Sequence, residues 1–145
     1  MEVNLETLTL TQVARVVDTA LAAARRCGVS PIALVVLDQA GQLKYSVRED
    51  GASLLRLNIA HGKAAAAFGM GVSSRTLHER ASANPVFFNA IASACGEGFI
   101  AQAGAVVIVG ENSDPIGAIG ASGGSGDEDE AVCMEGVQGA GLKYR

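Results

Sequence analysis

The stretch PIALVVLDQAGQLKYSVRE, residues 31–49, decides the fold class because it places two different strand patterns on either side of a turn. Its first part, PIALVVLD, is a continuous apolar run, which is typical of a fully buried strand. QAGQ then predicts a tight turn, and LKYSVRE alternates polar and apolar residues as a half-buried strand does. The stretch therefore predicts an antiparallel hairpin.

The segment before this hairpin, residues 9–28, is predicted to form one amphipathic helix. Apolar side chains recur at every third or fourth position, which is the spacing of a helix with one buried face. Thr9 and Gln12 match a capping box, which satisfies free N–H groups of the first turn. Gly28 is expected to end the helix because glycine suits the conformation found just beyond a helix end.

Three helical segments are predicted after the hairpin. Ser53 is expected to cap the first segment, which ends at Gly69. The second starts from Ser73 or Ser74, and the third follows a break at residues 84–85, an Asn–Pro pair.

Two short strands and a last helix complete the pattern. Residues 103–123, AGAVVIVGENSDPIGAIGASG, give two strands around the turn ENSD. The last helix has its expected apolar face at Ala131, Met134, Val137 and Leu142. The order helix, hairpin, helices, hairpin, helix implies an antiparallel sheet with helices packed on it, an α+β domain rather than a βαβ fold. No long linker divides residues 1–145, so a single domain is expected.

The composition excludes several classes of protein. Hydrophobic residues make up 49% of the chain, yet no apolar run is long enough to cross a membrane, so a soluble globular protein is expected. The net charge is −4 and the basic residues are spread along the chain, so nucleic acid is not an expected partner. The first ten residues lack the features of a signal peptide, which predicts a cytoplasmic location.

The three cysteines, Cys27, Cys95 and Cys133, are widely separated in the sequence. They share no CxxC or Cys/His spacing of the kind that tetrahedral zinc requires. All three are therefore predicted to be small core residues.

Several pieces of the sequence, taken in order, carry a family resemblance. They are the LTL start, the strand end VVLDQAGQL, REDGAS, the run IAHGKAAAAFGMGVSSRTLHERA, the Asn–Pro pair and PIGAIGASGGSGDEDEAV. In this order they resemble the GlcG/HbpS-like family, also called the DUF336 or haem-degrading-domain family, which includes the C-terminal domain of PduO-type proteins. The resemblance spans nearly the whole chain.

This resemblance implies a single-domain sandwich of the profilin-like or PAS-like kind, with a central antiparallel sheet, flanking helices and usually a homo-oligomeric assembly. It also implies a small-molecule ligand, because some relatives bind haem and others accompany catabolic pathways. The chain departs from the family at FIAQAGAVVI, where Ala103 and Gly104 replace a pair of glycines. Because Ala does not readily adopt a positive φ, this loop is expected to be altered.

His61 is the main candidate for a functional residue. On a helix it shares one face with apolar residues, and Asn58 lies at the edge of that face. Its sequence neighbours are Ala or Gly, which leaves room for a flat or small ligand. The residue is predicted to be an axial ligand of haem iron or a general acid/base. The structural alternative is a core histidine held by a hydrogen bond.

The other basic candidates have weaker patterns. Arg48 and Arg80 are candidates for holding a ligand carboxylate, with a local salt bridge as the alternative for Arg48. Lys63 lies on the helix face opposite His61, so a surface or subunit-contact role is predicted. His78 is expected on a solvated helix face.

The run GSGDEDE, residues 124–130, is predicted to begin the last helix. Asp127 is the expected cap, with Glu130 three residues on, and acids in a first turn complement the helix dipole. Two alternatives remain. Asp127 and Glu130 could supply oxygens to a hard cation, or the preceding loop could present backbone donors to a ligand through Ser122, Gly123 and Gly124.

Three functions are therefore open. The first is a small binding protein for haem or a similarly planar or anionic metabolite. The second is a catabolic enzyme, a tautomerase, deaminase or hydrolase, in which His61 acts as acid/base on a small unsaturated carboxylic acid and Arg48 or Arg80 holds the carboxylate. The third is an oligomeric accessory subunit.

Overall fold

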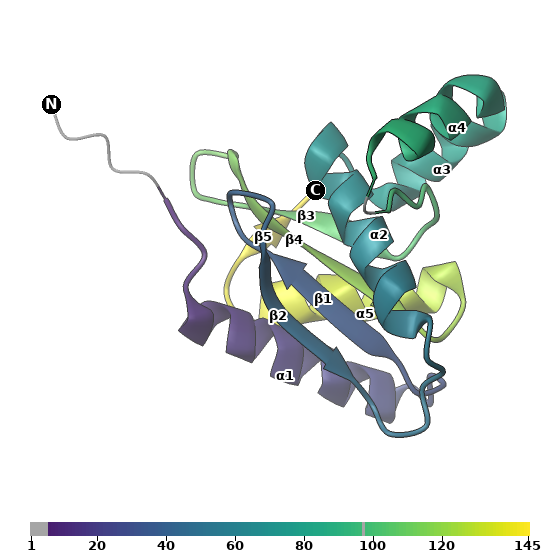
Figure 1. The fold of residues 1–145 in the computed structure, drawn as a ribbon. Coiled ribbons are helices and arrows are strands. Elements are labelled where there is room, and N and C mark those ends of the chain that lie inside the picture. Colours follow the sequence, from purple (N-terminus) through teal and green to yellow (C-terminus); the bar gives the residue numbers. More distant parts are fainter. Residues whose placement is uncertain (1–5, 97) are drawn as a thin grey trace, which may run out of the picture.

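Five helices and five strands make up the part of the chain that the computed structural model describes, residues 6–96 and 98–145 (Figure 1). In chain order they are α1 (Leu10–Arg26), β1 (Ala33–Leu37), β2 (Leu43–Arg48), α2 (Arg56–Met70), α3 (Ser74–Ala83), α4 (Pro85–Ala94), β3 (Ala105–Val109), β4 (Pro115–Ser122), α5 (Gly126–Gly139) and β5 (Lys143–Tyr144). Both predicted hairpins and all predicted helices are present. Only β5 was not predicted, because two residues are too short to show a periodic pattern.

The strands form one antiparallel sheet in the order β2-β1-β4-β3-β5. Every residue of β1 and β3 is buried, whereas β2 alternates between exposed and half-buried positions along its last four residues. The predicted α+β class and the central antiparallel sheet with flanking helices are confirmed. β2 forms an edge of the sheet, next to the start of α2.

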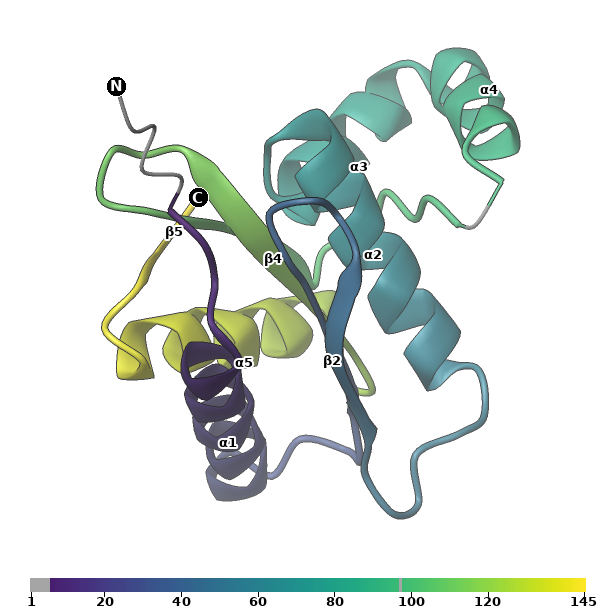
Figure 2. The ribbon, with the colours of Figure 1, turned by 60° about the vertical axis from the view of Figure 1, so that its left-hand side comes forward.

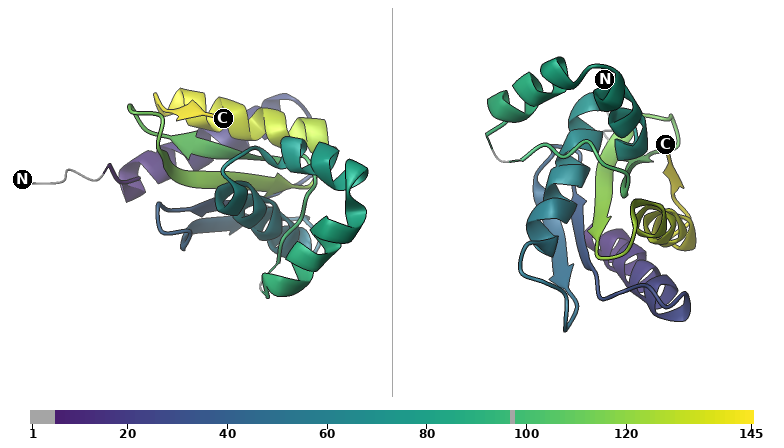
Figure 3. Two further views of the ribbon diagram at one scale, coloured as in Figure 1. Left: turned by 90° about the horizontal axis from the view of Figure 1, so that it is seen from above. Right: turned by 90° about the vertical axis from the view of Figure 1, so that its right-hand side faces the viewer.

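The helices cover both faces of the sheet (Figure 3). α1 and α5 lie together on one face, where Leu34 and Val36 of β1 join their apolar core. α2 lies on the other face and packs on Val35 and Leu37 of the same strand. α3 and α4 follow α2 and project from the side of the molecule (Figure 2). Within the described residues, no helix has both the length and the apolar character needed to cross a membrane.

α2 approaches the sheet closely because the residues between them are small. A Cβ atom on Gly120 of β4 would lie 2.3 Å from the carbonyl oxygen of Ala60 and 3.1 Å from the Cβ of Ala64. On its other side, Gly62 makes room for Ile100, whose N–H donates to the Gly62 carbonyl at 3.1 Å. Much of the space that the Ala/Gly run offers is therefore filled by the protein itself.

The predicted starts of α1 and α3 are confirmed, and the predicted start of α2 is wrong. Thr9 forms the expected capping box with Gln12, and Ser73 caps α3. Ser53 does not cap α2, because its carbonyl closes a turn with the N–H of Arg56 and the helix begins only there. α2 ends at Met70, followed by Gly71 with φ +75°, one residue beyond the predicted Gly69.

Of the four residues predicted to form the apolar face of the last helix, Met134, Val137 and Leu142 pack against the core, whereas Ala131 does not. Ala131 is exposed, and the buried apolar side chains of this helix are Val132, Cys133 and Val137. Gly136 sets this orientation, because a Cβ on it would lie 2.7 Å from the Val16 carbonyl oxygen of α1. The sequence pattern did not show that the buried side of α5 also includes Val132 and Cys133.

The cysteine prediction holds only for Cys133, which is buried. Cys27 and Cys95 are exposed, and they occupy the C-cap positions of α1 and α4. At both positions the chain leaves a helix at the surface, so the thiols do not reach the core.

Candidate functional site

His61 of α2 lies at the junction of two neighbouring hollows. The first hollow, of about 550 Å³, is lined by Val35, Leu43, Ser46, Leu55, Leu57, Asn58, Ile59, His61, Gly98 and Ile100. The second, of about 480 Å³, is lined by Gly41, Gln42, Leu43, His61, Ala65, Gly69, Met70, Ile91, Cys95, Gly98 and Phe99. Both include Leu43, His61 and Gly98, and the two hollows together are called the His61 groove below.

The walls of the His61 groove are mainly apolar. None of the described residues that line it is charged. Apart from the imidazole and the Cys95 thiol, its polar side chains are Ser46, Asn58 and Gln42. His61 is half-buried, and its imidazole makes no hydrogen bond among residues 6–96 and 98–145. The His78 ring, in contrast, places its Nδ1 3.2 Å from the Ala101 carbonyl oxygen. Both ring nitrogens of His61 are thus uncommitted within the described part of the chain.

The structure brings together only some of the predicted ligand-binding residues. Asn58 lines the first hollow with His61, as the helix face predicted. Arg48 lines a different hollow, beside Arg25 and Glu49, and its Nη1 donates to the Ala52 carbonyl at 2.7 Å. Arg80 is exposed on α3 and lines neither part of the groove. The two arginines are therefore not placed to hold a carboxylate beside His61.

The loop that follows β4 makes its polar contacts with the protein itself. The Ser122 hydroxyl accepts a hydrogen bond from Arg56 Nη1 at 3.2 Å, and the Gly124 N–H donates to Asp129 Oδ1 at 2.9 Å. At Gly123 a Cβ would lie 2.5 Å from the Pro31 carbonyl oxygen. Contrary to the sequence-based alternative, the Gly124 donor is thus engaged within the protein, and the glycines allow close backbone packing.

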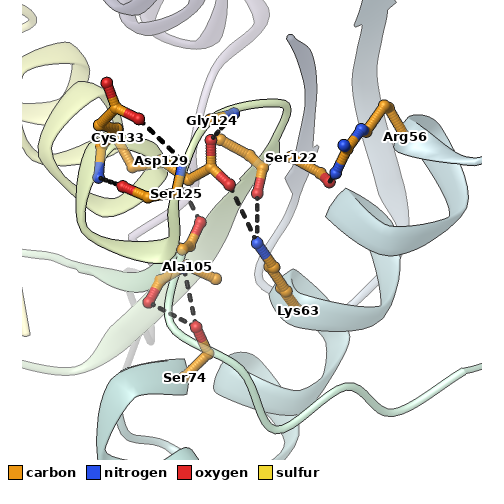
Figure 4. Close-up of polar contacts among 12 residues, drawn as sticks. Arg56, Lys63, Ser74, Ala105, Ser122, Gly124, Ser125, Asp129 and Cys133 are labelled. Carbon is orange, nitrogen blue, oxygen red and sulfur yellow. Dashed lines mark hydrogen bonds and ion pairs between the residues drawn. The ribbon is translucent and has the colours of Figure 1, made fainter. Parts of the chain in front are cut away.

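Lys63 is buried, so the predicted surface or subunit-contact role is wrong (Figure 4). Its Nζ lies 3.2 Å from Asp129 Oδ2 and donates to the Ala121 carbonyl at 3.0 Å. The side chains of Lys63 and Asp129 are 5% and 1% exposed. Because α2 packs so closely on β4, the lysine side chain reaches the first turn of α5.

Gly104 borders this ion pair. Its φ is +134°, and a Cβ there would lie 2.6 Å from Lys63 Nζ. Ala103 is buried and has no positive φ. The loop therefore needs a positive φ only at Gly104, although the family resemblance implies a pair of glycines there.

The cap of α5 is Ser125 and not Asp127. Ser125 has extended backbone, and its hydroxyl accepts from the Glu128 N–H at 3.1 Å. Glu128 Oε1 accepts from the Ser125 N–H at 2.9 Å, which completes a capping box. Asp127 lies inside the first turn, two residues too late to cap it.

Asp127 and Glu130 both bind Arg75 of α3. Arg75 Nε lies 3.0 and 3.1 Å from the two carboxylate oxygens of Glu130, and its Nη2 donates to Asp127. The hydrogen bonds that Arg75 donates, first to Asp127 and then to Glu130, raise the pKa of its guanidinium above its usual value. The described residues contain no group of three or more His, Cys, Asp or Glu side chains that could hold a metal ion.

The chain is thus an α+β protein whose antiparallel sheet carries helices on both faces, with an apolar groove at His61. The chain belongs to the HbpS-like family, because the family model described as "Haem degrading protein HbpS-like" matches residues 8–138. The resemblance seen in the sequence is thus confirmed. No protein of curated function matches the chain in sequence.

Solved structures show the same fold. A double mutant of HbpS from Streptomyces reticuli is 24% identical, with a TM-score of 0.80, over 93% of this chain and 88% of that chain. Protein ORFY of Klebsiella pneumoniae, from family DUF336, is 19% identical, with a TM-score of 0.86, over 97% of this chain and 94% of that chain. The structure named "PduOC:Heme Complex" is 19% identical, with a TM-score of 0.84, over 95% of this chain and 98% of that chain.

Proposed function

We propose that the protein binds haem, or a planar ligand of the same kind, in the His61 groove, with His61 as the ligand of the iron. The observation that carries the proposal is the position of His61, which lines both hollows and whose imidazole makes no hydrogen bond to the described residues. A neutral imidazole nitrogen is a common axial ligand of haem iron. Membership of the HbpS-like family and the likeness to the haem complex of PduOC support the same ligand.

The residues of the groove fit such a group. A tetrapyrrole needs an apolar slot, and Leu55, Leu57 and Ile100 supply apolar walls beside the imidazole. Each of the two hollows lies within the range of about 300–1,000 Å³ that is typical of ligand sites. When bound, haem would supply redox chemistry at its iron, tuned by the axial ligand and by the polarity of the walls.

The enzymatic alternative has less support from the same groove. Catalysis on an unsaturated carboxylic acid needs a cation for the carboxylate and polar groups that converge on the reacting atoms. Arg48 lines a separate hollow and Arg80 lies outside the groove, while Ser46 and Asn58 are the other polar side chains that line the first hollow. A binding site for a largely apolar body agrees better with these walls.

We also propose that the protein acts as a homo-oligomer in the cytoplasm. Leu54 is 79% exposed and Leu55 is 63% exposed, and both lie where the chain enters α2. Large apolar side chains exposed together are typical of an interaction surface. Light scattering combined with size-exclusion chromatography tests the assembly.

A haem titration followed by visible absorption tests the binding proposal. We expect saturable, stoichiometric uptake with a shifted Soret band for the native protein, and loss of that spectrum in His61→Ala. The matched control is His78→Ala, because His78 is exposed on α3 and should leave the spectrum unchanged. Equal spectra for His61→Ala and the native protein would overturn ligation by His61.

A further inference from the structure

One side of the first hollow is formed by β2, an edge strand of the sheet. Ser46 of this strand lines the hollow and is paired with Val35 of β1, which lines it as well. Tyr45 and Val47 instead pack against the apolar core on the other face of the sheet. Because successive side chains of a strand point to opposite faces, Lys44 lies on the same face as Ser46. The face of β2 that borders the groove therefore carries a lysine.

A β-bulge in β2 fixes the position of this lysine. Leu37 of β1 is paired with Leu43, whereas the residue before it is paired with Tyr45, so β2 contains one extra residue, Lys44. At a bulge, two residues of one strand lie opposite a single residue of its neighbour. Leu43 lines both hollows, and Lys44 is exposed and lines neither. Lys44 therefore lies at the rim of the His61 groove, between two residues of β2 that line it.

The polar side chains on the two sides of the first hollow have no partner within the described residues. The Ser46 hydroxyl on β2 and the Asn58 amide on α2 line the hollow and make no hydrogen bond among residues 6–96 and 98–145. In the same part of the chain, no ion pair includes Lys44. The carboxylate of Asp38, in the turn before β2, accepts from two N–H groups of its own turn at 2.9 and 3.1 Å. Three hydrogen-bond donors are thus available for a ligand of this hollow.

A planar ligand such as haem carries carboxylates at the edge of an apolar ring. The ring agrees with the apolar walls of the groove, but a carboxylate buried among those walls without a partner would be costly. At the rim, the carboxylate keeps its contact with water and meets the ammonium group of Lys44, which is a point charge on a flexible stem. The rim on β2 is therefore the favourable place for the carboxylate of such a ligand.

We propose that Lys44 selects ligands that carry a carboxylate and holds that carboxylate at the rim of the first hollow. The inference rests on the proposed function, because it concerns the same ligand in the same groove. The Ser46 hydroxyl and the Asn58 amide donate hydrogen bonds to the carboxylate oxygens, and the Lys44 ammonium supplies the opposite charge. Lys44 is thus a positioning residue and not a ligand of the iron.

Titrations with haem and with its dimethyl ester, followed by visible absorption, test the proposal. The ester lacks the negative charges of haem, and the ratio of the two affinities is compared between proteins, so that the greater hydrophobicity of the ester cancels. We expect Lys44→Met to lower the ratio of haem affinity to ester affinity about three- to fivefold, because an exposed ion pair contributes modestly. The loss should come from weaker haem binding alone. Lys44→Arg keeps the charge and should keep the native ratio.

The matched control is Lys143→Met. Lys143 is exposed as Lys44 is, but it belongs to β5, at the opposite edge of the sheet, so its removal should leave the ratio unchanged. Salt gives a second readout, because it screens interactions between exposed charges. Raising the salt concentration from about 0.05 M to about 0.5 M should lower the ratio in the native protein and in Lys143→Met, but not in Lys44→Met.

The outcomes separate this proposal from the proposed function. The same affinity ratio in Lys44→Met as in the native protein, or an equal loss of haem and ester binding in that variant, would overturn the role of Lys44. Uptake of both ligands that does not depend on His61 would instead refute ligation by His61, and with it the proposed function.

Discussion

Lys63 illustrates at the scale of one residue how an ionisable side chain is accommodated inside the protein. Its ammonium group has a carboxylate partner, Asp129, and a carbonyl partner on Ala121. Asp129 in turn accepts from the Gly124 N–H. Removing one member of such a buried pair leaves the other charge unpaired in the interior. The resulting loss of stability is larger than the stability that the intact pair contributes.

We therefore expect Lys63→Met to lower the free energy of unfolding by about 3–5 kcal/mol, because Asp129 remains buried without its cation. Urea denaturation measures the change. The matched control is Lys44→Met on the exposed side of β2, which should stay within about 0.5 kcal/mol of the native protein. Equal effects of the two substitutions would contradict the burial of Lys63. The double variant Lys63→Met, Asp129→Asn should recover part of the loss.

Cys133 makes stability depend on pH. Because burial raises the pKa of its thiol, the folded protein holds this proton more tightly than the unfolded chain does. The resulting stability is fully present below the unfolded pKa of about 8.5 and is lost as the pH rises above it, by about 1.4 kcal/mol per pH unit. Urea denaturation between about pH 7 and about pH 10 should show this decline, and the Cys133→Ala variant should lack it. Parallel curves for the two proteins would refute the assignment.

The candidate site could be predicted in part from the sequence. His61 and Asn58 follow from the helical periodicity of one segment, and both line the groove. Leu43 and Ile100 were missed because they come from distant segments that only the tertiary fold brings to α2. The periodicity of α2 predicts Lys63 at the surface because it lies on the face opposite His61. It does not show that this opposite face is also covered, by α5.

At the scale of elements, all four acids at the start of α5 make specific contacts within the chain. Asp127 and Glu130 bind Arg75, Glu128 completes the capping box, and Asp129 pairs with Lys63. One end of a single helix is thus joined to both α2 and α3. The acidic run is explained by these contacts within the chain.

The cap of α5 can be tested directly. Ser125→Ala removes the hydroxyl that accepts from the Glu128 N–H, and we expect it to cost about 1 kcal/mol of stability. Thermal or urea denaturation measures the loss. Ser53→Ala is the control, because Ser53 is exposed and does not cap α2; its effect should stay within about 0.5 kcal/mol. A larger effect at Ser53 than at Ser125 would show that the caps are misassigned.

Most elements could be predicted because their signals are local. The capping box at Thr9 and Gln12 and the alternation in β2 depend only on neighbouring residues. The start of α2 could not be predicted, since it depends on a turn at Arg56. The burial of Val132 and Cys133 in α5 could not be predicted either, since it depends on the contact of the helix with α1 at Gly136. The sequence-based predictions thus fail where tertiary contacts decide between helix starts or helix faces that look alike in the local sequence.

At the scale of the whole molecule, packing is uneven. β1 and β3 are buried along their full length between two helical layers, whereas α4 lies at the side and buries only Phe88. Local opening is easiest where few apolar contacts must be broken. The end of the groove that Cys95 lines is therefore attached to α4, the helix with the fewest buried side chains.

Hydrogen exchange followed by mass spectrometry should reveal this difference. We expect the amides of α4 to exchange rapidly through local opening, and those of β1 and β3 to exchange only with global unfolding. α1 serves as an internal reference because six of its side chains are buried in the main core. Protection of α4 equal to that of β1 would contradict the expected order of stability.

The contact between Gly120 and Ala60 also limits how the protein can diverge. Since a Cβ on Gly120 would lie 2.3 Å from the Ala60 carbonyl oxygen, the spacing between α2 and the sheet depends on a missing side chain. Any enlargement at positions 60, 64 or 120 would lift the helix that bears His61. Directed evolution toward new ligands should therefore keep these three positions fixed and diversify the rim, at Leu43 and Leu55, where side chains are already exposed.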